Sequence, residues 1–113
     1  TDTAGLAGTA TVSITLTVPV IPAIPTAMRV VRSASNAITT WRDRSNNETG
    51  FEIRREQRIN NVWTNTTIVG TVGANVQTFT NSGLPAGIYR YSVRAVNGSA
   101  ASAWTGWVQL TIP

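Results

Sequence analysis

Hydrophobic and polar residues alternate with a period of two along most of the chain, and no segment keeps the helical period of 3.6 residues. From Tyr89 to Ala95 the odd-numbered positions are aromatic or aliphatic, whereas the even-numbered positions are arginine or serine. This alternation is typical of an antiparallel strand with one face in a core and the other in water. Clusters of Gly, Asn, Ser and Pro, which favour turns, separate the segments. The expected strands are 10–18, 28–32, 37–42, 51–58, 63–69, 76–80, 88–96 and 107–112. Short strands at this spacing predict an all-β sandwich or barrel.

The first expected strand has the most regular alternation. One face carries only apolar side chains, and threonine or serine fills the positions between them; the apolar positions are Ala10, Val12, Ile14, Leu16 and Val18. Burying the four large aliphatic side chains contributes roughly 1.5 to 3 kcal/mol each, before the cost of ordering the chain. We therefore expect another surface to cover this face.

A proline-rich linker, 19–25, follows this strand. Pro19, Pro22 and Pro25 recur every three residues, which favours an extended polyproline II segment that rises about 3.1 Å per residue. Such a linker would hold the strand about 20 Å from the domain that begins near residue 26. We therefore expect residues 1–18 to complete another body. That body is either a preceding sandwich domain of the same polypeptide or a neighbouring copy that accepts the strand. Packing onto its own domain is the third alternative.

Length and composition limit the remaining possibilities. A chain of 113 residues has room for one domain, and without cysteine it forms neither a disulfide framework nor a thiolate metal site. The net charge of +4 comes from arginines that are spread over several segments, whereas nucleic-acid modules concentrate basic residues in one patch. Prolines interrupt the longest apolar region, 12–31. We expect neither a nucleic-acid partner nor insertion into a membrane.

The inventory of side chains argues against catalysis. Histidine and cysteine are absent, and the acidic residues are Asp2, Asp43, Glu48, Glu52 and Glu56. Glu52 and Glu56 flank Arg54 at two-residue spacing, which predicts an outward ladder of mixed charge. The stretch 43–48 offers oxygen ligands to calcium but lacks the spacing of a known calcium loop, so Asx-type turn bonding is the favoured interpretation. We expect no enzyme activity, no metal and no cofactor.

Landmarks in a fixed order identify a family resemblance. They are Trp41, the run DRSNNETGFEIRR at 43–55, the corner LPAGIY at 84–89 and the closing segment SAWTGWVQLTIP at 102–113. Together they resemble the fibronectin type III domain, in the variety common in bacterial secreted proteins, over residues 26–113. The resemblance implies a seven-stranded immunoglobulin-like sandwich in a secreted or cell-surface protein. It also implies that Trp41 is the central buried aromatic, and that Tyr89 bonds backbone a few residues upstream. Phe51, Ile53, Phe79, Leu84, Val93, Ala95, Val108 and Leu110 would complete the core.

One departure from the family pattern affects the strand at 37–42. The positions two and four before the tryptophan are usually large and apolar in the family, but here they are Thr39 and Ala37, and Ile38 lies on the opposite face. We expect a β-bulge near Ile38 to restore the register.

Exposed aromatic residues are the remaining candidates for binding. The closing strand places Trp104 inward and Trp107 outward, beside Arg90 and Arg94, which predicts a cation–π stack. The stretch 104–107 is similar to the Trp-Ser-any-Trp-Ser signature of cytokine-receptor fibronectin domains, from which only the stacking is carried over. A structural ladder is favoured over a ligand platform, and Trp63 is a weaker contact candidate.

These observations predict a non-catalytic structural or interaction module of an extracellular multidomain protein or strand-linked filament, joined to its neighbour through the strand at 10–18. The expected partner is a preceding sandwich domain or another copy of the chain. The alternative is a carbohydrate-binding or spacer module of a secreted hydrolase. In that case a polysaccharide would stack on Trp107 and Trp63.

Overall fold

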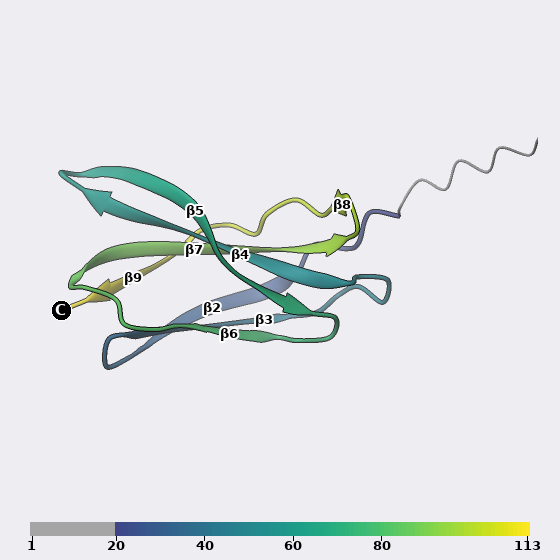
Figure 1. Cartoon of the computed structure of the whole chain (residues 1–113), viewed down its shortest axis with the longest axis horizontal. Helices are drawn as coiled ribbons and strands as arrows, with labels where there is room; N and C mark the ends of the chain where they lie inside the picture. The colour runs from purple at the N-terminus through teal and green to yellow at the C-terminus, as the bar shows by residue number, and fades with distance from the viewer. Residues whose placement is uncertain (1–19) are drawn as a thin grey trace, which may run out of the picture.

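The computed structural model describes residues 20–113, in which two antiparallel sheets face each other (Figure 1). One sheet has the order β2-β3-β6, formed by β2 (Thr26–Ser33), β3 (Asn36–Arg42) and β6 (Thr78–Asn81). The other has the order β5-β4-β7-β8, and β9 also pairs with β7; its strands are β4 (Gly50–Ile59), β5 (Val62–Gly73), β7 (Gly87–Asn97), β8 (Ala100–Ala101) and β9 (Val108–Ile112). The predicted all-β, immunoglobulin-like sandwich is confirmed. The expected strand 10–18 lies outside the described residues.

The core lies between the sheets and is rich in aromatic residues. Trp41 packs against Phe51 with ring centroids 5.5 Å apart, and Ile53, Val93 and Tyr91 are fully buried. All the residues predicted for the core are buried or pack against it, except Val108, which is only half-buried. Tyr91 and Ile112 are further core members. The alternation of β7 thus directs its odd-numbered side chains inward.

The bulge predicted near Ile38 is wrong. β3 pairs with β6 in unbroken register from Ala37 to Thr40, and the small residues themselves face the core. Ala37 and Thr39 are fully buried, and the Thr39 hydroxyl donates a hydrogen bond to the Phe79 carbonyl over 2.7 Å. Because this bond satisfies the hydroxyl, a polar residue is tolerated where the family usually has a large apolar one. The irregularity lies instead in β2, where Ala27 has a φ of 54°.

The tyrosine corner forms as the resemblance implied. The Tyr89 hydroxyl donates to the Pro85 carbonyl over 2.7 Å, and the ring is 1% exposed. On the same inward face, the Tyr91 hydroxyl donates to Oδ1 of Asn81, which also accepts a hydrogen bond from Arg55. Both buried phenols therefore have acceptors, as buried hydroxyls require.

The described part of the linker, residues 20–25, packs onto the sandwich. The side-chain amides of Asn47 and Asn97 both donate to the Val20 carbonyl, at 3.3 and 3.2 Å, and Pro22 and Pro25 are buried. The side chains of Val20 and Ile21 remain exposed, at 67% and 68%. We call the two amides and the Val20 carbonyl the linker clasp. It fixes where the chain leaves the domain.

Within the described range, no helix has the length and the apolar character that a membrane crossing requires.

Candidate functional site

Tryptophan and arginine side chains alternate over the outer face of the larger sheet. The guanidinium carbon of Arg54 lies 4.3 Å from the ring centroids of both Trp104 and Trp107. That of Arg90 lies 4.4 Å from the rings of both Trp63 and Trp107. Arg94 closes the series over Trp104 at 4.5 Å. We call this series the tryptophan–arginine ladder; its order is Trp63, Arg90, Trp107, Arg54, Trp104 and Arg94.

Strand register brings opposite charges together in the ladder. Glu52, Arg54 and Glu56 lie at alternate positions of β4, on the face opposite Phe51 and Ile53. In the pairing with β7, Glu52 is opposite Arg94 and Glu56 is opposite Arg90. Each arginine donates from Nε to its glutamate over 2.7 Å and forms an ion pair with it. These cross-strand pairs hold the guanidinium planes in place for stacking.

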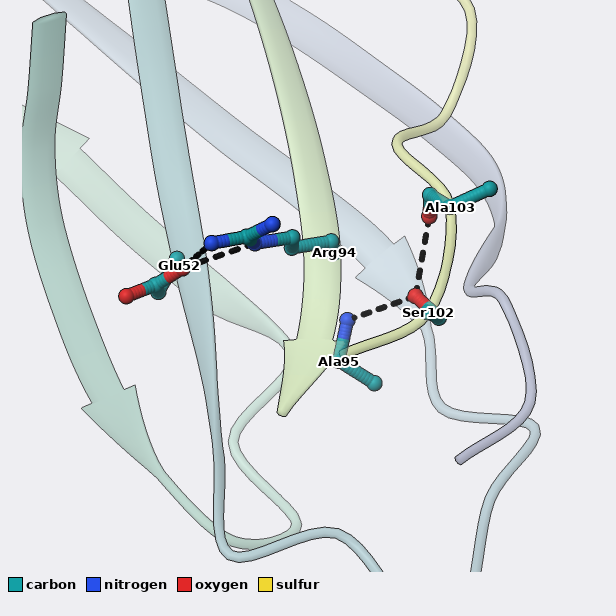
Figure 2. A network of polar contacts seen from close by, with 5 residues as sticks. All are labelled: Glu52, Arg94, Ala95, Ser102 and Ala103. Atoms are coloured by element: carbon teal, nitrogen blue, oxygen red, sulfur yellow. Dashed lines mark hydrogen bonds and ion pairs between the residues drawn. The ribbon is translucent and has the colours of Figure 1, made fainter. Parts of the chain in front are cut away.

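The indoles of Trp104 and Trp107 come from the segment 102–107, which both backbone and side-chain hydrogen bonds hold to β7. The Ser102 and Thr105 N–H groups donate to the Ala95 and Val93 carbonyls over 2.8 and 2.9 Å. The Ser102 hydroxyl accepts from the Ala95 N–H at 3.0 Å and donates to the Ala103 carbonyl. Figure 2 shows the hydrogen bond from Ala95 to Ser102 on one side of β7 and the ion pair of Arg94 with Glu52 on the other side. The Thr105 hydroxyl similarly accepts from the Val93 N–H at 3.0 Å. These bonds replace regular strand pairing between β8 and β9.

Burial affects the ionisation of the ladder unevenly. Desolvation lowers the pKa of Arg54, and the neighbouring charges of Arg94 and Arg90 lower it further, whereas Glu56 raises it. Arg54 Nε is buried and has no hydrogen-bond partner among residues 20–113. The pKa of Glu56 is lowered, chiefly by the hydrogen bond from the Thr66 hydroxyl. The charge of the Arg54 guanidinium is therefore stabilised more by contact with the indole ring faces than by hydrogen bonds.

The structure brings three of the four predicted surface residues into direct contact. Trp107 and Trp63 both stack on Arg90, while Arg94 lies over Trp104. The inward placement predicted for Trp104 is wrong, because its ring lies against Arg54 and Arg94 on the outer face. Sequence reasoning placed Arg54 outward but did not identify it as the central rung. Only its position between two acidic residues in an alternating strand pointed to that role.

Stacking uses both faces of two indoles. Two guanidinium groups that lie 4.3 and 4.4 Å from one ring centroid would overlap on the same face, so Arg54 and Arg90 cover opposite faces of Trp107. By the same reasoning Arg54 and Arg94 cover both faces of Trp104. Sugars stack on open ring faces, and the rings of Trp104 and Trp107 offer no open face. The ladder is suited to hold the segment 102–107 on the sheet.

The loop at 43–49 forms turn bonds. The Ser45 N–H donates to Asp43 Oδ1 over 2.9 Å, in the predicted Asx pattern, and the Asn75 N–H donates to Glu48 over 2.9 Å. Burial and the nearby Glu48 raise the pKa of Asp43. Burial acts to raise the pKa of Glu48 as well, but the hydrogen bond from Asn75 lowers it overall. Residues 20–113 contain no group of three or more His, Cys, Asp or Glu side chains placed to hold a metal.

The predicted joining residues Ala10, Val12, Ile14, Leu16 and Val18 lie outside the described residues. Their role therefore stays a prediction.

Comparisons with known proteins identify the fold. No protein-family model matches the chain, and no curated protein matches it. The chain is similar in structure to the third fibronectin III domain of the human KIAA0343 protein, with a TM-score of 0.68 and 20% identity over 96% of this chain and 94% of that one. It is also similar to an Fn3-like protein from Clostridium thermocellum, with a TM-score of 0.64 and 21% identity over 83% and 96%.

A third similar structure contains several domains. The chicken CNTN1 FN1–FN3 structure matches with a TM-score of 0.66 and 20% identity, over 77% of this chain and 31% of that one. These similarities, together with the two facing sheets and the tyrosine corner, show that the chain has the fibronectin type III fold.

Proposed function

We propose that the chain is a non-catalytic structural and interaction module of a secreted or cell-surface protein of bacterial type, joined to its neighbour through the strand at 10–18. The neighbour is a preceding sandwich domain of the same polypeptide or another copy that accepts the strand. The likeness to a Clostridium thermocellum Fn3-like protein and to one domain of a multidomain structure supports this setting.

The linker clasp is the observation that carries the proposal. Two side-chain amides, one from the loop at 43–49 and one from the end of β7, converge on one carbonyl, and two linker prolines are buried against the domain. A flexible tether needs no such contacts. A joint that must keep its direction does, because every fixed backbone dihedral reduces the motion of the segment beyond it. The clasp therefore favours a load-bearing connection at the N-terminal side of the domain.

The alternative of a sugar-binding module that uses Trp107 and Trp63 receives no support from the ladder geometry. Both faces of Trp107 are covered by guanidinium groups. Trp63 lies against Arg90 at 4.4 Å and has Arg58 at 5.9 Å. A sugar would have to displace an arginine that is already paired with a glutamate.

The joining role is tested in the full chain by a matched pair of variants. Ile14→Asp places a charge on the apolar face of the predicted strand, and Thr15→Asp places the same charge on its polar face. We expect the unmodified chain to self-associate in sedimentation velocity, or to bind a hydrophobic dye as a monomer that lacks its partner domain. Ile14→Asp should abolish both behaviours, and Thr15→Asp should keep them. A monomeric unmodified chain whose dye binding equals that of Ile14→Asp contradicts the proposal.

The clasp is tested separately by NMR relaxation of the linker amides. Replacing Asn47 and Asn97 together by alanine should raise the fast mobility of the Val20 and Ile21 amides, whereas Asn46→Ala in the same loop should not. Equal mobility in all three proteins would show that the buried prolines alone fix the linker.

A further inference from the structure

A hollow of about 570 Å³ opens on the other sheet, close to where the linker enters β2. It is lined by Ala27, Arg29, Thr40, Trp41, Arg42, Asp43, Arg44 and Gln77. Three of these residues are arginines, and all three are exposed. The hollow lies within the size range of small-ligand sites in proteins. None of its residues belongs to the tryptophan–arginine ladder.

Register explains why the arginines converge. Arg29 of β2 is opposite Thr40 of β3, and Arg42 follows two positions after Thr40 on the same face of the strand. Arg44, in the next loop, is turned back over the start of β2, because its Nε donates to the Thr26 hydroxyl over 3.0 Å. Thr26 is itself opposite Arg42. Two strands and a loop thus deliver three positive charges to one place.

The hollow presents mainly hydrogen-bond donors. Among the described residues, neither Arg29, Arg42 nor Arg44 forms an ion pair. The Gln77 side-chain oxygen Oε1 accepts from the Asp43 N–H over 2.8 Å, so the NH2 donors of the same side chain are left for the hollow. The buried Trp41 Nε1–H has no acceptor among the residues that the structure describes. Unpaired donors beside three positively charged side chains favour an anionic ligand.

One carboxylate opposes this preference. Asp43 also lines the hollow, but its Oδ1 is engaged by the Ser45 N–H, and its other neighbour is the Glu48 carboxylate. The three arginines still give the lining a positive balance. Asp43 is therefore expected to weaken anion binding, and its replacement by asparagine should strengthen it, since asparagine can still accept from Ser45.

We propose that this hollow binds an anionic polysaccharide through the sulfate or carboxylate groups of its sugars. Guanidinium groups recognise such planar or tetrahedral oxyanions by paired hydrogen bonds. The outer face of the sheet continues from the hollow with the hydroxyl-bearing residues Thr78 and Thr80, opposite Thr40 and Ile38, which suit sugar hydroxyls. Single-stranded nucleic acid is disfavoured, because its binding sites use exposed aromatic side chains. The only aromatic residue of the hollow, Trp41, is 4% exposed.

The test measures binding of the full chain to dextran sulfate and to polygalacturonate, with neutral dextran as the negative control and oligo-dT as the nucleic-acid probe. Arg42→Ala and Arg44→Ala should each weaken binding about tenfold or more, as expected for lost charge-assisted hydrogen bonds. Arg32→Ala removes another exposed arginine, at the far end of β2 and outside the hollow, and should leave the affinity within about twofold. Asp43→Asn should increase the affinity for both anionic polysaccharides. The indole N–H resonance of Trp41 should shift on titration.

Three results would overturn the proposal: no binding to either anionic polysaccharide, an equal loss in Arg32→Ala and Arg42→Ala, or tighter binding to oligo-dT than to both polysaccharides. Thermal melting of each variant confirms that the exposed arginines were removed without unfolding. Repeating the titration with Ile14→Asp keeps this inference separate from the joining role. If Ile14→Asp abolishes self-association, polysaccharide binding should stay unchanged. If Arg42→Ala or Arg44→Ala abolishes polysaccharide binding, self-association should stay unchanged.

Discussion

Arg54 is the central rung of the tryptophan–arginine ladder, and replacing it with methionine is the most direct test of what holds the segment 102–107 to the sheet. The substitution keeps a flexible apolar side chain of similar length but removes the guanidinium group that lies 4.3 Å from both Trp104 and Trp107. No other arginine of the ladder has two contacts as close. Arg54→Met therefore removes the middle of the series while leaving the cross-strand ion pairs in place.

The expected magnitude combines opposing terms. Each cation–π contact contributes roughly 0.5 to 2 kcal/mol, so two contacts are worth roughly 1 to 4 kcal/mol. Against this loss, methionine removes the buried Arg54 Nε, which has no hydrogen-bond partner, and leaving such a group unsatisfied costs about 1 to 3 kcal/mol. The single variant therefore reports a difference between two terms of similar size. A double-mutant cycle separates the contact itself from that background.

The cycle uses Arg54→Met and Trp107→Leu, alone and together, with urea unfolding followed by far-UV circular dichroism. We expect a coupling energy of about 0.5 to 2 kcal/mol between Arg54 and Trp107. A control cycle with Arg32→Met, on the other sheet, should be additive within about 0.5 kcal/mol. Coupling in the Arg54 cycle no larger than in the control would refute the idea that stacking on Arg54 holds the segment 102–107.

Further predictions concern ionisation and backbone packing. Burial raises the pKa of Tyr91 to about 12. Stability present below pH 10 should therefore fall by up to about 2.7 kcal/mol as the pH rises from 10 to 12, and Tyr91→Phe should remove this loss in urea titrations. The lowered pKa of Glu56 predicts stability that is present above its unfolded pKa and lost as the pH falls through the folded value; Glu56→Gln should flatten thermal melting temperatures between pH 5 and 3. Gly50→Ala should lower the melting temperature by several degrees, because its Cβ would lie 2.4 Å from the Val72 carbonyl oxygen, whereas Gly73→Ala, which meets nothing within 4 Å, should not.

The fold could be predicted from the sequence because its main signals are local. Alternation fixes which face of a strand is buried, and turn residues mark where strands end. β7 illustrates this: its buried positions Tyr89, Tyr91 and Val93 are the ones that the alternation predicts. The bounds of the described strands, the closing strand included, differ from the predicted ones by a few residues at most, and the short strand β8 was not predicted.

Two of the errors, the bulge near Ile38 and the inward placement of Trp104, both involve side-chain hydrogen bonds that the sequence pattern does not reveal. Thr39 is buried because its hydroxyl reaches the Phe79 carbonyl, so no bulge is needed beside it. Trp104 lies in a segment where Ser102 and Thr105, three residues apart, bond through backbone and hydroxyl groups to Ala95 and Val93, which are two residues apart. Strand alternation does not apply across this irregular pairing. Periodicity carries no information on such long-range bonds.

The complete ladder could not be predicted from the sequence, since its residues come from four separate parts of the chain: β4, β5, β7 and the segment 102–107. Trp107 beside Arg90 was foreseeable from the pairing of the last two strands. The contact of Arg54 with both indoles depends on how the segment 102–107 lies beside β7, and this placement is set by tertiary structure.

The two sheets differ in how much of their binding chemistry is already used internally. On the larger sheet, Arg90 and Arg94 are paired with glutamates, and together with Arg54 they cover the tryptophan rings, so charges and ring faces satisfy one another. On the smaller sheet, Arg29 and Arg42 have no such partners among the described residues. Pairing a guanidinium with an oxyanion gains more when the guanidinium has no partner to lose. An anionic ligand should therefore prefer the smaller sheet, although aromatic residues are the usual guide to sugar binding in a sequence. The exposed arginines of β2 and β3 are the better guide in this fold, because no carboxylate among the described residues pairs with them.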